Sequence, residues 1–242
     1  MRTLTAAIIG LAFIIGLFIV ARAYKYRSTS QDTIIVTGSA EKDFVSDLVV
    51  WSGSYSRKSL DLKSAYAQLK DDEKIIRDYL HSKGLSDTSM VFSSVNIIKE
   101  FNYKTDQNGR ALGQEFSGYN LTQTVRIESG EVDKIAAISR QATELIQQGI
   151  EFNSSAPLYY YTKLTDIKMD LLAKASADGK KRAEIIAENA GNSLGKLKKA
   201  TLGVFQITGK NTDEDYSYGG TFNTSSRNKT GSITIRMEFA VD

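Results

Sequence analysis

Strict alternation of hydrophobic and polar residues marks residues 232–242 as the most regular segment of the chain. Ile233, Ile235 and Met237 alternate there with Thr234 and Arg236. A hydrophobic residue at every second position predicts a strand with one buried and one solvent-exposed face, which is typical of antiparallel sheet. By the same criterion, and from short apolar runs, strands are predicted at residues 33–40, 47–55, 93–103, 119–128, 157–164 and 196–208.

Hydrophobic residues spaced three or four positions apart predict helices between these strands. The first helix follows Ser59 and ends at Gly84, the second follows Ser129 and ends at Gly149, and the longest starts after Thr165. These residues are typical helix caps. The predicted order is ββαββαβαββ, an α+β fold with helices packed on a mainly antiparallel sheet. The apolar stripe of the first helix comprises Leu62, Tyr66, Leu69, Ile76 and Leu80.

Small residues follow one face of the longest predicted helix and continue past its end. Alanine and glycine on a helix face allow its backbone to lie close against a sheet or another helix. Gly191 is predicted to end this helix in a left-handed conformation, and Gly195 to form the turn that follows. The predicted buried face comprises Ile167, Leu171, Ala175, Gly179, Ala183, Ile186 and Ala190. A structural seam that serves packing is predicted at Ala183, Ala187, Ala190, Gly191 and Gly195.

The N-terminal segment is almost entirely apolar. Between residues 4 and 20 Thr5 is the only polar side chain, and this run approaches the ~20 residues that a helix needs to cross a bilayer. It is either a retained anchor or a signal peptide cleaved after residues 21–23. The run exceeds the usual signal-peptide core of about 7–15 residues, which favours the anchor. We expect an anchor at residues 1–26 that contacts the membrane through residues 4–23, a tether at 27–32 and a body at 33–242.

Charge is unevenly divided between this segment and the body. Four of the 31 Lys and Arg residues precede residue 31, where there is no Asp or Glu, so the body carries 27 basic residues against 28 acidic ones. A nearly neutral body lacks the electrostatic footprint of a nucleic-acid-binding protein. Arg2 precedes the apolar run and Arg22, Lys25 and Arg27 follow it, so the positive-inside rule slightly favours a cytoplasmic body.

The residue inventory excludes several kinds of site. Cysteine is absent and His81 is the only histidine, so disulfides, thiol chemistry and two-histidine metal sites are excluded. Residues 209–231 are rich in Gly, Ser, Asn and Asp, which predicts a flexible polar loop. Within it, Asn211, Asp213 and Asp215 have the spacing of the first three ligands of a calcium-binding loop. Tyr216 stands where that loop requires glycine, which favours a solvated loop. We therefore predict no catalytic, cofactor-binding or metal-binding residues.

Aromatic residues are concentrated in two places, and two interpretations of them are open. In one, three adjacent tyrosines alternate between a core face and a half-exposed face of a strand. In the other, exposed aromatics contribute to a subunit contact, because interfaces are enriched in them. The residues of this possible contact are Tyr159, Tyr160, Tyr161, Tyr216, Tyr218 and Phe222.

Three stretches resemble the SIMPL-domain family, the family of bacterial periplasmic immunogenic proteins. They are IIVTGSAEKDFVSD, GYNLTQTVRIESGEVDKIAAI and AKASADGKKRAEIIAENAGNSLGKL, which together fall within residues 33–207. The resemblance implies an envelope protein with its body in the periplasm, homo-oligomerisation and an association with envelope or oxidative stress. It outweighs the small charge bias towards a cytoplasmic body, and it supplies no catalytic residues.

Two functions remain as hypotheses. The first is a non-enzymatic protein, held in the inner membrane by a single span, that acts by self-assembly as a scaffold, chamber or partner-binding module. If the N-terminal segment is cleaved, the same body is soluble in the periplasm. The second is a small-ligand-binding protein or a hydrolase, which requires polar groups that converge in a pocket.

Overall fold

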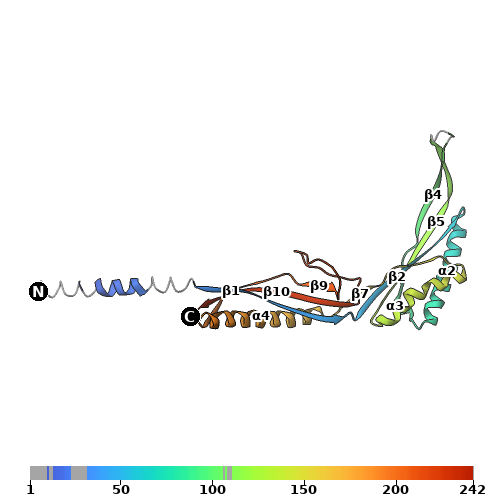
Figure 1. The fold of residues 1–242 in the computed structure, drawn as a ribbon. Helices are drawn as coiled ribbons and strands as arrows, with labels where there is room; N and C mark the ends of the chain where they lie inside the picture. The colour runs from blue at the N-terminus through green and yellow to red at the C-terminus, as the bar shows by residue number, and fades with distance from the viewer. Residues whose placement is uncertain (1–9, 11–12, 23–31, 106, 108–110, 242) are drawn as a thin grey trace.

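The computed structural model describes residues 10, 13–22, 32–105, 107 and 111–241. The body consists of two antiparallel sheets, each with its own helices and its own hydrophobic core. Figure 1 shows them end to end, joined where β1 runs into β2. This confirms the α+β class and the antiparallel pairing, and the strands are divided between two sheets.

The first sheet, which we call sheet A, is formed by segments from both ends of the body. β1 (Thr33–Val45) pairs along its whole length with β10 (Asn228–Val241), and β10 pairs on its other side with β8 (Leu194–Leu202) and β9 (Gln206–Gly209). The predicted alternation in the last strand is confirmed, because Ile233, Ile235, Met237 and Phe239 are all buried. Residues 228–231, expected in the loop, are the start of β10.

The long helix α4 (Leu164–Asn189) packs on β1 and β10. Its closest approach is at Gly179, which lies against Gly38 of β1. A Cβ atom added to Gly38 would lie 2.6 Å from the Gly179 nitrogen and closer still to the carbonyl oxygen of Ala175. Real Cβ atoms do not come so near to backbone atoms, so glycine at position 38 is what lets the helix lie directly on the sheet.

The second sheet, sheet B, is built around β2 (Leu48–Ser59) and β5 (Ala111–Ser129). β3 (Met90–Phe92) and β4 (Asn96–Thr105) pair with β5, while β6 (Phe152–Ser154) and β7 (Leu158–Tyr160) pair with β2. The hairpin of β4 and β5 projects away from the body in Figure 1. The short strands β3 and β6 lie outside the predicted order, because three residues are too few for alternation to show. The strand predicted at residues 196–208 is divided into β8 and β9.

Two helical segments cover the inner face of sheet B. α2 (Leu62–Ser82) begins after Asp61, whose side chain accepts a hydrogen bond from Ser64 N, so the predicted cap at Ser59 is wrong. Leu62 and Tyr66 of the predicted stripe are exposed. α3 (Val132–Gln141) continues as the 3-10 helix η2 (Ala142–Gln148) and ends, as predicted, at a left-handed Gly149. A single 3-10 turn, η1 (Asp87–Ser89), follows α2.

The predicted membrane anchor is described only in part. Residue 10 and residues 13–22 are helical with exposed side chains, whereas the rest of residues 1–26 and tether residues 27–31 lie outside the described residues. Across the described ranges, we find no helix that combines the length and the apolar character needed to cross a bilayer. The N-terminal segment enters the body at Thr33, the end of sheet A that lies farthest from sheet B (Figure 1).

Candidate functional site

Within the described residues, one edge of sheet A is open along the first part of β1, where no further strand pairs with it. Val241 N–H donates to the carbonyl oxygen of Asp32, whereas Ser39 N–H points away from β10 and donates to Asp178 Oδ2 at 2.9 Å. Because backbone groups alternate in direction along an antiparallel strand, Ile35 and Thr37 also turn their N–H and C=O groups outward. The hydrogen bond that Asp178 accepts from Ser39 N–H, together with its ion pair with Arg182, lowers the pKa of Asp178.

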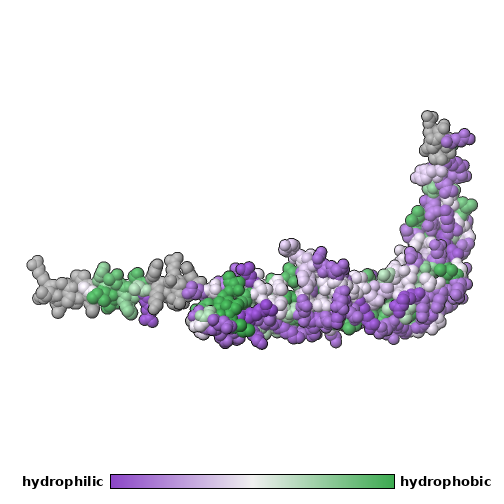
Figure 2. Space-filling model, in the orientation of Figure 1, coloured by the Kyte–Doolittle hydropathy of each residue, from purple (hydrophilic) through white to green (hydrophobic). Residues whose placement is uncertain are grey.

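A groove runs between this open edge and the overhanging flank of α4. It has a volume of about 530 Å³ and is lined by Ile35, Val36, Thr37, Arg182, Ile185 and Ile186. Ile185 and Ile186 are 49% and 48% exposed, so the prediction that Ile186 is buried is wrong. Figure 2 shows hydrophobic residues gathered at the end of the body where β1 begins.

The opposite edge of sheet A is open as well. Gly203 N–H donates to the carbonyl oxygen of Thr234, so the alternation turns the backbone groups of Ala200 and Leu202 to the outside. Leu197 and Leu202 pair with Phe239 and Ile235 and therefore share the sheet face that α4 covers. They are nevertheless 51% and 57% exposed, because α4 lies over β1 and β10 and reaches little of β8.

The structure separates the six aromatic residues of the predicted subunit contact. Tyr159 packs against the core of sheet B, and Tyr161 packs against the core of sheet A, with its ring 4.9 Å from that of Phe44. Tyr160 lies 6.5 Å from Phe222, ring centroid to ring centroid. The most exposed aromatics of the set are Tyr216, Tyr218 and Phe222.

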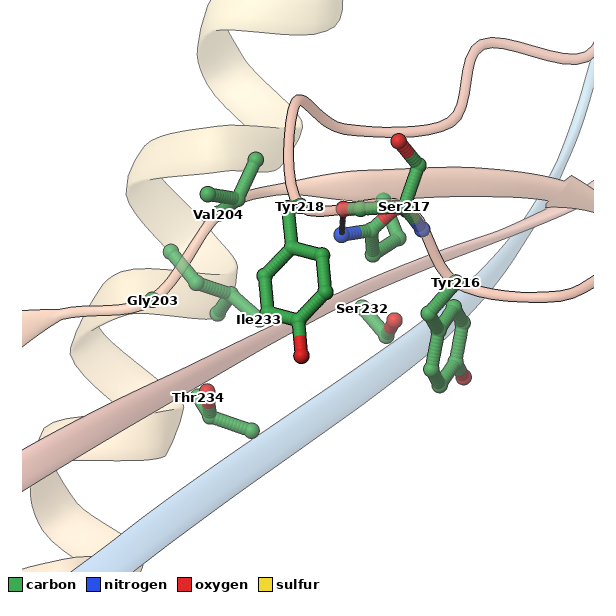
Figure 3. A pocket seen from close by; sticks show the side chains of 9 residues that line it. Gly203, Val204, Tyr216, Ser217, Tyr218, Ser232, Ile233 and Thr234 are labelled. Atoms are coloured by element: carbon green, nitrogen blue, oxygen red, sulfur yellow. Dashed lines mark hydrogen bonds between the residues drawn. The ribbon is translucent and has the colours of Figure 1, made fainter.

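Tyr216 and Tyr218 stand over a cleft on the outer face of sheet A. The cleft has a volume of about 550 Å³, and Figure 3 shows the rings of Tyr218 and Tyr216 on either side of Ser232 of β10. It is lined by Gly203, Val204, Gln206, Tyr216, Ser217, Tyr218, Ser232, Ile233 and Thr234. This lining offers aromatic rings, hydroxyls and an amide, but no carboxylate or basic side chain. The arrangement is suited to holding a neutral ligand.

Buried polar side chains hold the loop at residues 210–227 in place. Gln206 is buried, and its side chain bonds to the backbone of Ser217 and Thr221. Lys229 is 1% exposed and donates to the carbonyl oxygen of Asn223 at 2.5 Å. Burial lowers the pKa of Lys229 to about 8. These roles were not predicted, since nothing in the local sequence shows that a lysine is enclosed by a loop.

Acidic residues of this loop serve the fold. Glu214 accepts hydrogen bonds from Gly209 N–H and from the Asn223 side chain, and the first of these has the larger effect in lowering its pKa. Within the described ranges, no three His, Asp or Glu residues are grouped to hold a metal ion. His81 Nδ1 contacts the carbonyl oxygen of Leu85 at the end of α2.

The predicted seam is divided between the helix face and the turn after it. Ala183 and Ala187 are fully buried against sheet A. Ala190 and Gly191 are exposed, so the predicted burial of Ala190 is wrong, and Gly195 is half-buried. Gly191 has a φ of 78°, the left-handed conformation predicted for the end of the helix. Gly38 of β1 belongs to the same packing surface, because it lies against Gly179 of α4. A local sequence pattern does not reveal this contact, since the two residues are far apart in the chain.

Comparison with known proteins gives one family. The model of the SIMPL family, described as a protein of unknown function (DUF541), matches residues 34–239, which span both sheets and most of the chain. No curated protein matches the chain. With both sheets inside the matched range, the chain belongs to the SIMPL family.

Proposed function

We propose that this protein is a non-enzymatic, membrane-anchored protein of the bacterial envelope that acts through homo-oligomeric assembly. The observation that supports this most directly is that sheet A has an open edge on each side, each flanked by exposed apolar side chains. Exposed strand edges are ready-made surfaces for pairing with another chain, and proteins that remain monomeric usually protect them.

The N-terminal segment strengthens this proposal. The apolar run of residues 4–20 joins the body at the end where the two edges are open. An anchor confines the bodies to two dimensions and raises their effective concentration, so weak lateral contacts are enough for assembly. The family resemblance supports a periplasmic body, with a role as a scaffold, chamber or partner-binding module and an association with envelope or oxidative stress.

Native mass analysis of the full chain, extracted from membranes in mild detergent, tests the assembly. We expect particles with a defined number of subunits, and a chain that is strictly monomeric over a range of detergents and concentrations would contradict the proposal. A compartment-sensitive reporter fused after Asp242 tests the topology, and activity of that reporter in the cytoplasm would contradict the periplasmic placement.

The cleft under Tyr216 and Tyr218 favours a second function, the binding of a small neutral ligand. Its lining supplies ring faces and hydroxyls and no acid–base pair, which favours binding over hydrolysis. Isothermal titration with neutral oligosaccharides tests this function, with Tyr218→Ala as the variant and Tyr103→Ala as the control at another exposed tyrosine. Equal heats for the wild type and both variants would count against a ligand in the cleft.

A further inference from the structure

The two open edges of sheet A lie at the same height along the strands. Residues 235–241 of β10 pair with β8 on one side and with residues 32–38 on the other. The edge of β1 is open over this same stretch, up to Ser39, whose N–H is taken by Asp178. If copies are anchored in one membrane, the β8 edge of each copy is level with the open stretch of β1 in the next.

We propose that copies join edge to edge, with β8 of one copy pairing in parallel with residues 33–38 of β1 in the next. The proposal rests on the proposed function and specifies its interface. β1 and β8 are both antiparallel to β10, so they run in the same direction. A membrane anchor keeps all copies in the same orientation, and the contact between them is therefore parallel.

The backbone groups on the two edges are in phase for this pairing. Ala200 and Val36 both lie opposite Met237, so they stand level when one sheet continues into the next. Ala200 turns its N–H and C=O outward, and so do Ile35 and Thr37 on either side of Val36. In a parallel ladder a residue bonds to the two neighbours of the residue opposite it. Ala200 N–H therefore donates to Ile35 C=O, and Thr37 N–H donates to Ala200 C=O.

The side chains on the helix side complement each other as well. Leu197 and Leu202 of β8 are left uncovered by their own α4. In the next copy, Ile185 and Ile186 overhang the open edge of β1, where none of the described strands lies beneath them. Continuing the sheet places the β8 leucines under this overhang, so that both apolar surfaces are removed from water. A shift of one residue would turn the leucines to the other face.

The contact uses a different surface on each copy, so it is heterologous. Heterologous contacts generate a ring when the rotation between copies closes, and an open array when it does not. Lysines at positions 196, 198 and 199 of β8 disfavour unselective edge pairing, a common protection of edge strands. Three features then select the correct pairing of β8 with β1. The two edges are level, their outward N–H and C=O groups match, and α4 of the next copy covers the β8 leucines.

Engineered cysteines test the register, because the native chain has none. Thr37 and Thr201 both pair with Arg236, and both are exposed on the outer face of the sheet. Full-length chains in membranes are treated with a short dimaleimide cross-linker. We expect a ladder of covalent oligomers from the double variant Thr37→Cys/Thr201→Cys. A mixture of the two single variants is expected to give dimers only, and neither single variant alone is expected to cross-link.

The matched control is Thr88→Cys/Thr201→Cys, whose first position is also exposed but lies on η1 beside sheet B. It is expected to give no ladder. Dimers from Thr37→Cys alone would indicate a two-fold contact and would overturn the proposal. A native oligomer without cross-links in the double variant would overturn the edge pairing while leaving the proposed function standing. A strict monomer would overturn both.

A proline at the β8 edge provides an independent test. Ala200→Pro removes an N–H that points outward and so spares the hydrogen bonds between β8 and β10. We expect this variant to lose oligomers in native mass analysis while its melting temperature in detergent stays within about 3 °C of wild type. Ala200→Val keeps the N–H and is expected to assemble normally. Wild-type assembly of the proline variant would contradict the proposal.

Discussion

Replacing Gly38 by alanine should be among the most damaging single-methyl changes in the body. The added Cβ would lie 2.6 Å and 2.8 Å from the nitrogen and Cα of Gly179, and closer still to the carbonyl oxygen of Ala175. All three are backbone atoms of α4, so no side-chain rotation relieves the clash. The helix must lift from sheet A and loosen the packing of Leu171, Ala175 and Ala183.

The cost is estimated from overpacked cores, where an added methylene costs about 1–3 kcal/mol. Because a rigid helix must move, we expect Gly38→Ala to lower the free energy of unfolding by about 3 kcal/mol. At about 2–4 °C per kcal/mol for a chain of this size, the melting temperature should fall by about 6–12 °C.

The matched control is Gly179→Ala on the other side of the same contact. Its Cβ meets mainly the end of the flexible Met237 side chain and stands 3.2 Å from Gly38. Alanine also gains about 1 kcal/mol over glycine within a helix. We expect a net cost of about 0–2 kcal/mol, smaller than that of Gly38→Ala.

Urea unfolding followed by far-ultraviolet circular dichroism measures both variants. Trp51, the only tryptophan, lies in the core of sheet B and reports that sheet separately through its fluorescence. If Gly38→Ala unfolds at the wild-type midpoint, or is less destabilising than Gly179→Ala, the inferred close contact between α4 and β1 is wrong.

Three further predictions concern buried polar groups. Lys229 has a folded pKa of about 8, below the value of about 10.4 for an unfolded lysine, so the unfolded chain binds more protons between these pH values. Wild-type stability relative to Lys229→Met should therefore rise with pH across that interval in urea titrations, and a flat difference would refute the assignment. Asp72→Asn breaks a bidentate pair with the partly exposed Arg57 and should cost about 2 kcal/mol in urea unfolding, whereas a cost near zero would show that the pair is not stabilising. Gln206→Ala should release the loop that its side chain holds and speed trypsin cleavage after Lys210 at unchanged melting temperature, and equal cleavage rates would contradict this role.

The sequence determined those features that depend on local pattern. Alternation identified β10 and its buried face, and glycines at positions 149 and 191 marked helix ends because their left-handed conformation disfavours a side chain. Composition excluded thiol chemistry and disulfides. The caps were less predictable: Ser59 and Asp61 both carry suitable oxygen atoms, and the path of the chain decides which one accepts the hydrogen bond.

Only the tertiary structure decided which strands are edges and which apolar residues stay exposed. β1 and β10 lie at opposite ends of the sequence, and their pairing leaves β1 and β8 on the outside of sheet A. Ile186 follows the periodicity of a buried residue but overhangs the edge of the sheet, since α4 is placed by the contact between Gly38 and Gly179. Exposure of this kind depends on contacts between distant segments, which a local pattern of hydrophobic residues does not encode.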